Sequence, residues 1–141
     1  MVKRLCIAFL SALLSFPAFG QEAKEMAMAF AAAYERGDTS ASQYVWYDGP
    51  HVGDMGGTPE ELEKELLPAE LKKNAKDPAE AKPGEVVFSE NDAAYGHDVW
   101  YVSYDARGKT HKLCLHKVDG TWKVDLSYLW MGDWYDWMPG Y

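Results

Sequence analysis

Cysteine is nearly absent from this sequence of 141 residues, which contains only Cys6 and Cys114. Cys6 lies in an N-terminal segment that we expect to be removed, so the mature chain keeps one thiol. An intramolecular disulfide is then excluded, and the hydrophobic core must hold the fold by itself. Cys114 stands between Leu113 and Leu115, a setting that favours a small packed residue over a reactive nucleophile.

Basic side chains are also scarce. The formal net charge is −8, and removing Lys3 and Arg4 leaves 12 basic against 22 acidic side chains, a charge of −10. Phosphate groups and anionic membranes repel such a chain. The composition therefore argues against nucleic-acid binding.

No apolar run is long enough to span a bilayer. The longest, Leu5–Phe16, follows Lys3 and Arg4 and precedes the small residues Ala18 and Gly20. This is the pattern of a secretory signal peptide, which we expect at residues 1–20, with cleavage after Gly20. No cysteine stands at the cleavage point, so we expect no lipid anchor and a secreted protein, periplasmic in a bacterium. Residues 21–129 should form one domain, and residues 130–141 an aromatic C-terminal tail.

The first half of the mature chain has helical periodicity. An apolar stripe predicts a helix over Glu22–Arg36 that ends at Gly37. Asp38 and the hydroxyls after it can cap a short second helix to about Trp46. Residues 47–57 should form a loop because they are dense in Gly, Asp and Pro.

A third helix should begin at Thr58, which with Glu61 makes a capping box around Pro59. Pro68 lacks a backbone N–H, so we expect the helix to break near Leu67 and to restart over residues 68–74. Residues 75–84 carry charges and two prolines and should connect to a sheet.

From Glu85 onward the period becomes two. Strands are expected at 86–89, 94–104, 109–118 and 121–129, and Asp119-Gly120 supplies the positive φ angles of a two-residue hairpin turn. The alternation of apolar and polar residues implies an antiparallel sheet with one covered face. The whole therefore reads as an α+β domain with N-terminal helices packed on about four antiparallel strands.

The segments Ala31–Asp38 and Leu115–Asp125 resemble the short secreted bacterial members of the nuclear-transport-factor-two-like, or cystatin-like, superfamily. The first ends a helix in Gly-Asp, and the second is the final hairpin Leu-His-Lys-Val-Asp-Gly-Thr-Trp-Lys-Val-Asp. The resemblance implies a curved sheet that wraps a long helix and leaves a conical cavity. It also implies dimerisation through the outer sheet face, where Val99, Tyr101 and Leu129 supply apolar area. The superfamily includes isomerases, dehydratases, small-ligand binders and protein-binding modules, so the fold alone selects no function.

The histidines do not form a coherent catalytic or metal-binding pattern. His97 and Asp98 are adjacent in a strand and should point to opposite faces, which hinders pairing as base and orienting carboxylate. His111 and His116 are five residues apart and should also face opposite ways. With His51 they show none of the usual ligand spacings, and we expect neither a metal nor a cofactor.

Aromatic residues offer the best candidates for binding. Large rings mostly fill cores, but a tail of aromatics among Gly, Asp and Pro suggests either back-folding over the domain or contact with a partner. The tail should form neither a stable helix nor a strand. The candidate binding residues are Trp46, Tyr47, Trp100, Tyr104, Trp122, Trp134 and Trp137.

We therefore expect a secreted, non-enzymatic binding module that engages an apolar small molecule or a protein partner through an aromatic-lined concavity or tail. One alternative is an enzyme of the isomerase or dehydratase kind with a carboxylate or His base, which requires an ionisable side chain inside a pocket. Another is a structural or inhibitory interaction protein.

Overall fold

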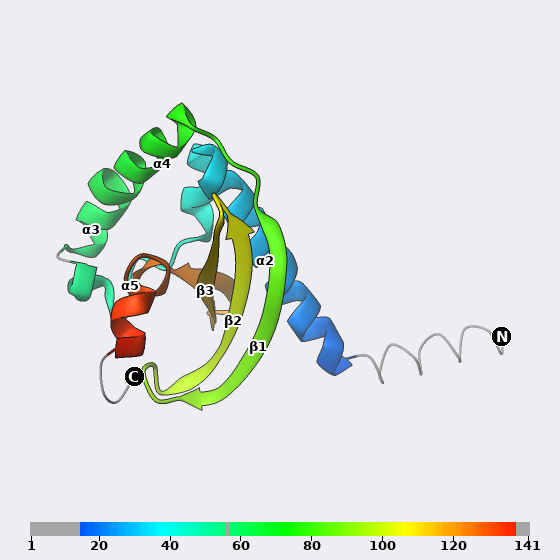
Figure 1. The fold of residues 1–141 in the computed structure, drawn as a ribbon. Helices are drawn as coiled ribbons and strands as arrows, with labels where there is room; N and C mark the ends of the chain where they lie inside the picture. The colour runs from blue at the N-terminus through cyan, green and yellow to red at the C-terminus, as the bar shows by residue number, and fades with distance from the viewer. Residues whose placement is uncertain (1–14, 56, 138–141) are drawn as a thin grey trace.

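The computed structural model describes the backbone of residues 15–55 and 57–137, and the side chains of residues 20–54 and 57–131. Helices come first, and a curved four-stranded antiparallel sheet of order β1-β2-β3-β4 follows, which confirms the α+β class and is consistent with the expected superfamily fold (Figure 1). The elements are α2 (Ser15–Arg36), η1 (Thr39–Tyr44), η2 (Val52–Met55), α3 (Pro59–Glu61), η3 (Leu62–Leu66), α4 (Leu67–Lys76), β1 (Lys82–Asp92), β2 (His97–Ala106), β3 (Lys109–Val118), β4 (Thr121–Asp125) and α5 (Leu126–Trp137).

Helix α2 confirms the predicted helix and its C-terminal end, but it begins earlier, at Ser15, and continues through the expected cleavage point. Gly37 ends it with φ of +73°, which glycine adopts without steric cost. A Cβ on Gly37 would overlap the backbone of Leu71 and Ala75. Two features therefore require glycine at this position: the positive φ angle and the close approach of α4.

The predicted break at Pro68 is wrong. α3, η3 and α4 follow one another without a gap, and the Thr58 hydroxyl caps the start by accepting from Glu61 N–H at 3.2 Å, as expected. The segment η3 is a π-helix in which Leu67 N–H bonds the carbonyl of Leu62. Widening the turn just before a proline relieves its clash with the preceding turn, so the chain stays helical.

The sheet has the four expected strands, but β1 is longer than predicted and β4 is shorter. β3 matches its predicted range, and the Asp119-Gly120 turn has φ angles of 51° and 79°, as predicted. Arg107-Gly108 makes the same kind of turn between β2 and β3, with φ of 56° and 73°. Both pairs suit the two-residue turns that match strand twist.

The prediction of a fourth strand to Leu129 and of a tail without helix is also wrong. β4 ends at Asp125, and the backbone of Leu126–Trp137 is helical, with a kink at Met131. The Asp125 Oδ1 accepts hydrogen bonds from the Ser127 N–H and hydroxyl at 2.9 and 2.5 Å. This is an N-cap geometry, and it turns the chain from strand to helix.

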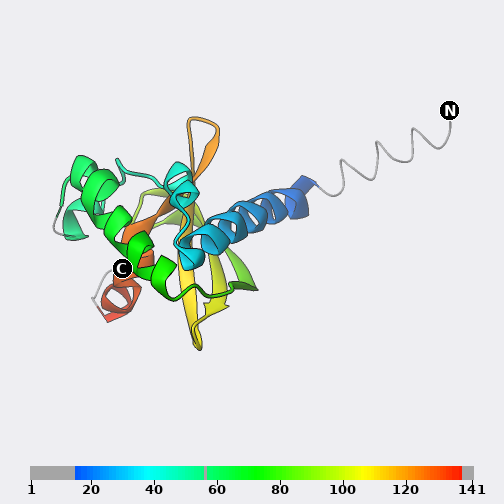
Figure 2. The same ribbon diagram turned by 90° about the horizontal axis from the view of Figure 1, so that it is seen from above.

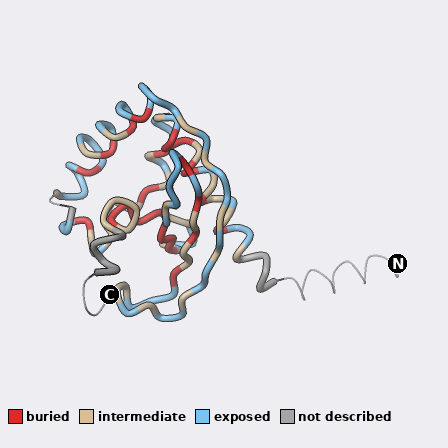
Figure 3. The backbone as a smooth tube through the Cα atoms, viewed as in Figure 1, coloured by how far each residue is buried: buried red, intermediate tan, exposed pale blue. Residues whose placement is uncertain are grey.

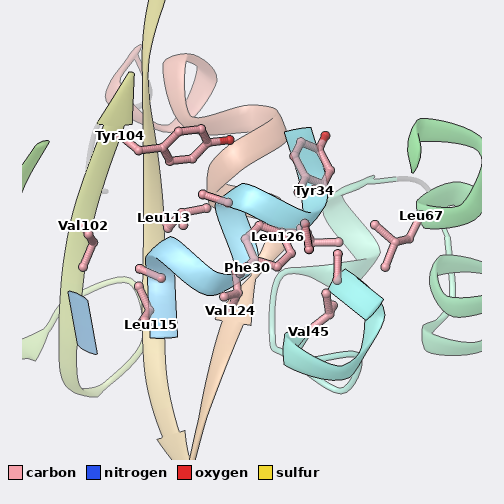
Figure 4. Packing of buried hydrophobic residues seen from close by; sticks show 14 of the residues in the cluster. Phe30, Tyr34, Val45, Leu67, Val102, Tyr104, Leu113, Leu115, Val124 and Leu126 are labelled. Atoms are coloured by element: carbon pink, nitrogen blue, oxygen red, sulfur yellow. The ribbon is translucent and has the colours of Figure 1, made fainter. Parts of the chain in front are cut away.

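The main core lies between α2 and one face of the sheet, where buried residues gather (Figure 3). Ala23, Ala27 and Ala31 form a fully buried stripe along α2, so the helix backbone packs close to its neighbours. Further along, Phe30 packs among Leu113, Leu115, Val124 and Leu126 (Figure 4). The opposite face of the sheet is partly covered and carries a smaller group of polar and aromatic side chains.

Candidate functional site

A cavity of about 380 Å³ lies where the C-terminal ends of α2 and α4 meet the β2–β3 end of the sheet and α5. Figures 1 and 2 show α4 beside the C-terminal end of α2. The cavity is on the same sheet face as the core, and its wall combines charged, polar and apolar side chains. The lining residues are Tyr34, Glu35, Glu70, Asn74, Arg107, His111, Leu129 and Trp130.

The floor of the cavity contains a buried ion pair. Glu35, whose side chain is 3% exposed, accepts from Arg107 Nε at 3.2 Å, and its backbone carbonyl accepts from Arg107 Nη2 at 3.0 Å. Arg107 Nη1 reaches Asp77 at 3.4 Å. Arg107 can make these contacts because the β2–β3 turn holds it at positive φ and directs it back toward α2. Two carboxylates, from Glu35 and Asp77, therefore pair with this one guanidinium.

Tyrosines from α2 and β2 support this floor. The Tyr34 hydroxyl accepts from Trp130 Nε1 at 2.8 Å, and the Tyr34 carbonyl accepts from Asn74 Nδ2 at 2.9 Å. Burial is the main cause that raises the pKa of Tyr34 to about 12. The Tyr104 hydroxyl donates to Glu35 at 3.4 Å, and burial followed by the nearby Glu35 charge raises the Tyr104 pKa. Both phenols are therefore neutral at physiological pH, as hydrogen-bonding groups.

His111 and Glu70 complete the polar wall. His111 Nε2 lies 3.1 Å from the Ala106 carbonyl, which can only accept, so Nε2 carries a proton; in the neutral form of the ring Nδ1 is then the acceptor. The ring stacks on Tyr104 at 5.0 Å. Glu70 makes no ion pair with any residue that the structure describes.

A second cluster of titratable side chains lies on the other face of the sheet. His97 Nε2 and His116 Nδ1 are 2.7 Å apart, and His116 Nε2 lies 3.4 Å from Cys114 Sγ and 3.9 Å from Asp125 Oδ2. The rings of Trp46 and Tyr95 each pack on His116 with centroids 4.5 Å apart. The predicted separation of His111 and His116 onto opposite faces is confirmed.

His116, Cys114 and Asp125 in this second cluster are buried, whereas His97 at its edge is exposed. Burial first, then the neighbouring His97, lowers the pKa of His116 to about 3, while burial raises the pKa of both Asp125 and Cys114. A protonated, buried thiol is a poor nucleophile. The Tyr95 hydroxyl and Asp125 Oδ2 are buried without a well-formed hydrogen bond, although their proximity contributes to the raised Tyr95 pKa. Cys114 is thus a packed residue, as its flanks predicted.

A smaller pocket of about 220 Å³ lies on the same face as this network, lined by Glu85, Val87, Tyr101, Ser103, Lys112 and Tyr128. Among the residues expected to make an apolar dimer surface, Tyr101 lies here and donates to Asp92 at 2.7 Å. Val99 is buried, and Leu129 instead lines the larger cavity.

The aromatic residues predicted to bind a ligand are distributed over both faces of the sheet, and none of those with described side chains lines the larger cavity. Tyr104 is buried beneath the cavity, Trp100 packs at a tilt against Phe88 with ring centroids 4.8 Å apart, and Trp122 donates to Glu22 at 3.5 Å. Trp46 packs on His116, and Tyr47 donates to the Ser42 carbonyl at 2.8 Å. The side chains of Trp134 and Trp137 lie outside those that the structure describes.

Sequence reasoning missed the residues that do line the cavity. The sequence places Tyr34 in the helix stripe and Trp130 in the aromatic tail 130–141, and no pattern assigns a role to Glu35 or Arg107. The usable signals were a charged Glu35 beside the apolar stripe and an Arg at the first position of a two-residue turn, where a side chain can reach back across the sheet.

Comparison with family models, with curated proteins and with solved structures finds no match to this chain. Over the part of the chain that the structure describes, no set of three or more His, Cys, Asp or Glu side chains has the arrangement of a metal site. No helix among those same residues is both long enough and apolar enough to cross a membrane.

Proposed function

We propose that this protein is a binding module that holds a small organic molecule in the cavity between α2, α4, the β2–β3 turn and α5. The observation that carries the proposal is the cavity itself, about 380 Å³ in volume, with apolar and hydrogen-bonding groups converging on it. Ligand sites in proteins are typically of this size and combine an apolar wall with a few well-placed polar groups.

The lining is held in place before any ligand arrives, which supports binding over a purely structural role. Glu35 and Arg107 fix each other, Trp130 is anchored on Tyr34, and Asn74 ties α4 to α2. Groups already fixed in position lose little conformational freedom on binding, so more of the interaction energy appears as affinity.

Secretion and membership of the nuclear-transport-factor-two-like superfamily remain part of this proposal. The α+β layout and the curved antiparallel sheet support the superfamily assignment, because both are what the resemblance implies. A secreted binder that takes up a small molecule outside the cytoplasm is the corresponding biological role.

The test is a fragment screen by ligand-observed NMR on the chain from residue 21 onward, compared with the variant Leu129→Trp, which fills the cavity from α5. Trp100→Phe, remote from the cavity, is the matched control. We expect a subset of fragments to bind the parent and Trp100→Phe but not Leu129→Trp. If every bound fragment is retained by Leu129→Trp, or if none binds the parent, the proposal is wrong.

The second candidate function is an enzyme of the isomerase or dehydratase kind, and one observation favours it. His111 lines the cavity and is oriented through Nε2, which leaves Nδ1 as an acceptor that could take a proton from a bound substrate. Turnover of a fragment identified in the screen, lost in His111→Asn while binding is retained, would establish the enzyme. Binding with no chemical change in the fragment would favour the module.

A further inference from the structure

Three of the side chains that line this cavity offer hydrogen-bond acceptors. Asn74 uses Nδ2 to bond the Tyr34 carbonyl, which leaves Oδ1 to accept. His111 uses Nε2 to bond the Ala106 carbonyl, which leaves Nδ1 to accept. The Glu70 carboxylate is the third acceptor, and all three side chains line the same space.

The charges of the lining do not cancel. Arg107 pairs with Glu35 and with Asp77, at N–O distances of 3.2 and 3.4 Å, so its one positive charge offsets only one of these two carboxylates. Glu70 has no cationic partner among the described residues, and its negative charge contributes to the raised pKa of Tyr34, which places it near that ring. Among the residues that line the cavity, Glu35 and Glu70 carry two negative charges and Arg107 one positive charge, which leaves one net negative charge in a chain whose net charge is −8.

Apolar and aromatic groups face this charge. Leu129 and Trp130 from α5 and Tyr34 from α2 form the rest of the wall. An ammonium group is attracted both to a carboxylate and to the face of an aromatic ring, best of all Trp. A primary ammonium also has three N–H donors, the number of acceptors found here.

Building on the proposed function, we propose that the ligand is a small primary amine, bound as its ammonium ion, with an attached aryl or short alkyl group. The ammonium contacts Glu70, Asn74 and His111, and the apolar group packs against Trp130, Tyr34 and Leu129. An ion pair and a cation–π contact acting together favour the cation over a neutral analogue by about tenfold.

The test compares three probes of one skeleton by isothermal titration calorimetry at pH 7: 2-phenylethylamine, 2-phenylethanol and 3-phenylpropionate. We expect the amine to bind at least about tenfold more tightly than the alcohol, and the carboxylate to show no measurable binding. Glu70→Gln should reduce the preference for the amine to within about threefold. Glu65→Gln, an equal change of charge at an exposed position on η3, should leave the preference unchanged.

The possible outcomes distinguish failure of the amine assignment from failure of the proposed binding function. If amine and alcohol bind equally and Leu129→Trp abolishes both, the cavity binds small molecules but the amine assignment is wrong. Tighter binding of the carboxylate would make Arg107 the anchor and would also overturn the assignment. Amine binding that survives both Glu70→Gln and Leu129→Trp would lie elsewhere and would overturn the assignment. If the three probes and the fragment library all fail to bind, the proposed function fails with it.

Discussion

The buried His116 makes this fold sensitive to acid, and the substitution His116→Gln measures the effect. The side chain is 1% exposed, and it lies among His97, Cys114, Asp125, Tyr95 and Trp46. Asp92 and His51 also act on it through their charges. Burial lowers its pKa from 6.5 to about 3. Between these two pH values His116 is therefore protonated in the unfolded chain and neutral in the folded protein.

The sign and size of the effect follow from linkage. Because the folded pKa is depressed, the stability contributed by His116 is fully present above pH 6.5 and is lost as pH falls toward 3. At about 1.4 kcal/mol per pH unit the wild-type chain loses roughly 3 kcal/mol through this residue by pH 4. That is a large part of the total stability of a typical domain. Asp125 acts in the opposite direction, because its pKa is raised by burial, but it does so equally in wild type and variant.

The assay is urea denaturation of wild type and His116→Gln at pH 7 and pH 4, followed by tryptophan fluorescence. At pH 7 the variant should be less stable by about 1 kcal/mol, since it loses the hydrogen bond to His97 and the ring contacts. At pH 4 the order should reverse, with the variant more stable by about 2 kcal/mol. Tyr95→Phe, which keeps the histidine, should retain the wild-type loss in acid. A constant difference between wild type and His116→Gln at both pH values would refute the reasoning.

Three further predictions concern stability. Arg107→Met should destabilise the fold by about 3 kcal/mol or more, since it leaves Glu35 charged and buried. In a double-mutant cycle measured by urea denaturation, adding Glu35→Gln should recover part of this loss. If the effects of the two substitutions simply add, the two side chains are not paired. Gly37→Ala should lower the free energy of unfolding by about 2 kcal/mol or more, because the added Cβ overlaps α4. The control Gly53→Ala has open space around it and should stay within about 0.5 kcal/mol of the parent by thermal unfolding. Equal melting temperatures for the two variants would count against the close approach of α4 to Gly37. Tyr95→Phe should leave the free energy of unfolding at pH 7 unchanged or raise it, because it removes a buried hydroxyl that has no well-formed hydrogen bond. If the free energy of unfolding falls by more than about 1 kcal/mol, the hydroxyl makes a stabilising hydrogen bond and the prediction is wrong.

Much of the fold could be predicted because local rules agreed with tertiary packing. The apolar stripe before Gly37, the Thr58 cap and the Asp119-Gly120 turn each specify their conformation within a few residues. The two wrong predictions came from local signals that longer-range structure modified. Pro68 is accommodated by the π-helical turn before it, and the alternation after Trp122 continued into Leu126, which is buried but belongs to a helix capped by Asp125.

The candidate site was much harder to predict. Its residues come from distant parts of the chain: Glu35 and Arg107 are far apart in sequence, and Trp130 reaches Tyr34 only because α5 folds back as a helix. Aromatic content alone pointed to Trp100, Tyr104 and Trp122, since ring size is visible in a sequence whereas the neighbours of a ring are not. His97 and His116 likewise meet through strand register, which no spacing rule within one strand can show.

The alanine stripe of α2 has a consequence for how this cavity could change during evolution. On the buried side of α2, small side chains at Ala23 and Ala27 are followed by the large side chains of Phe30 and Tyr34 near the C-terminal end, which lines the cavity. The spacing between helix and sheet there is thus set by residues that do not all touch the cavity. We therefore expect larger residues at Ala27 or Ala31 to push α2 away from the sheet and change the size of the cavity without altering Glu70, Asn74 or His111, so that the size of the accepted molecule and the chemistry that recognises it could be selected separately.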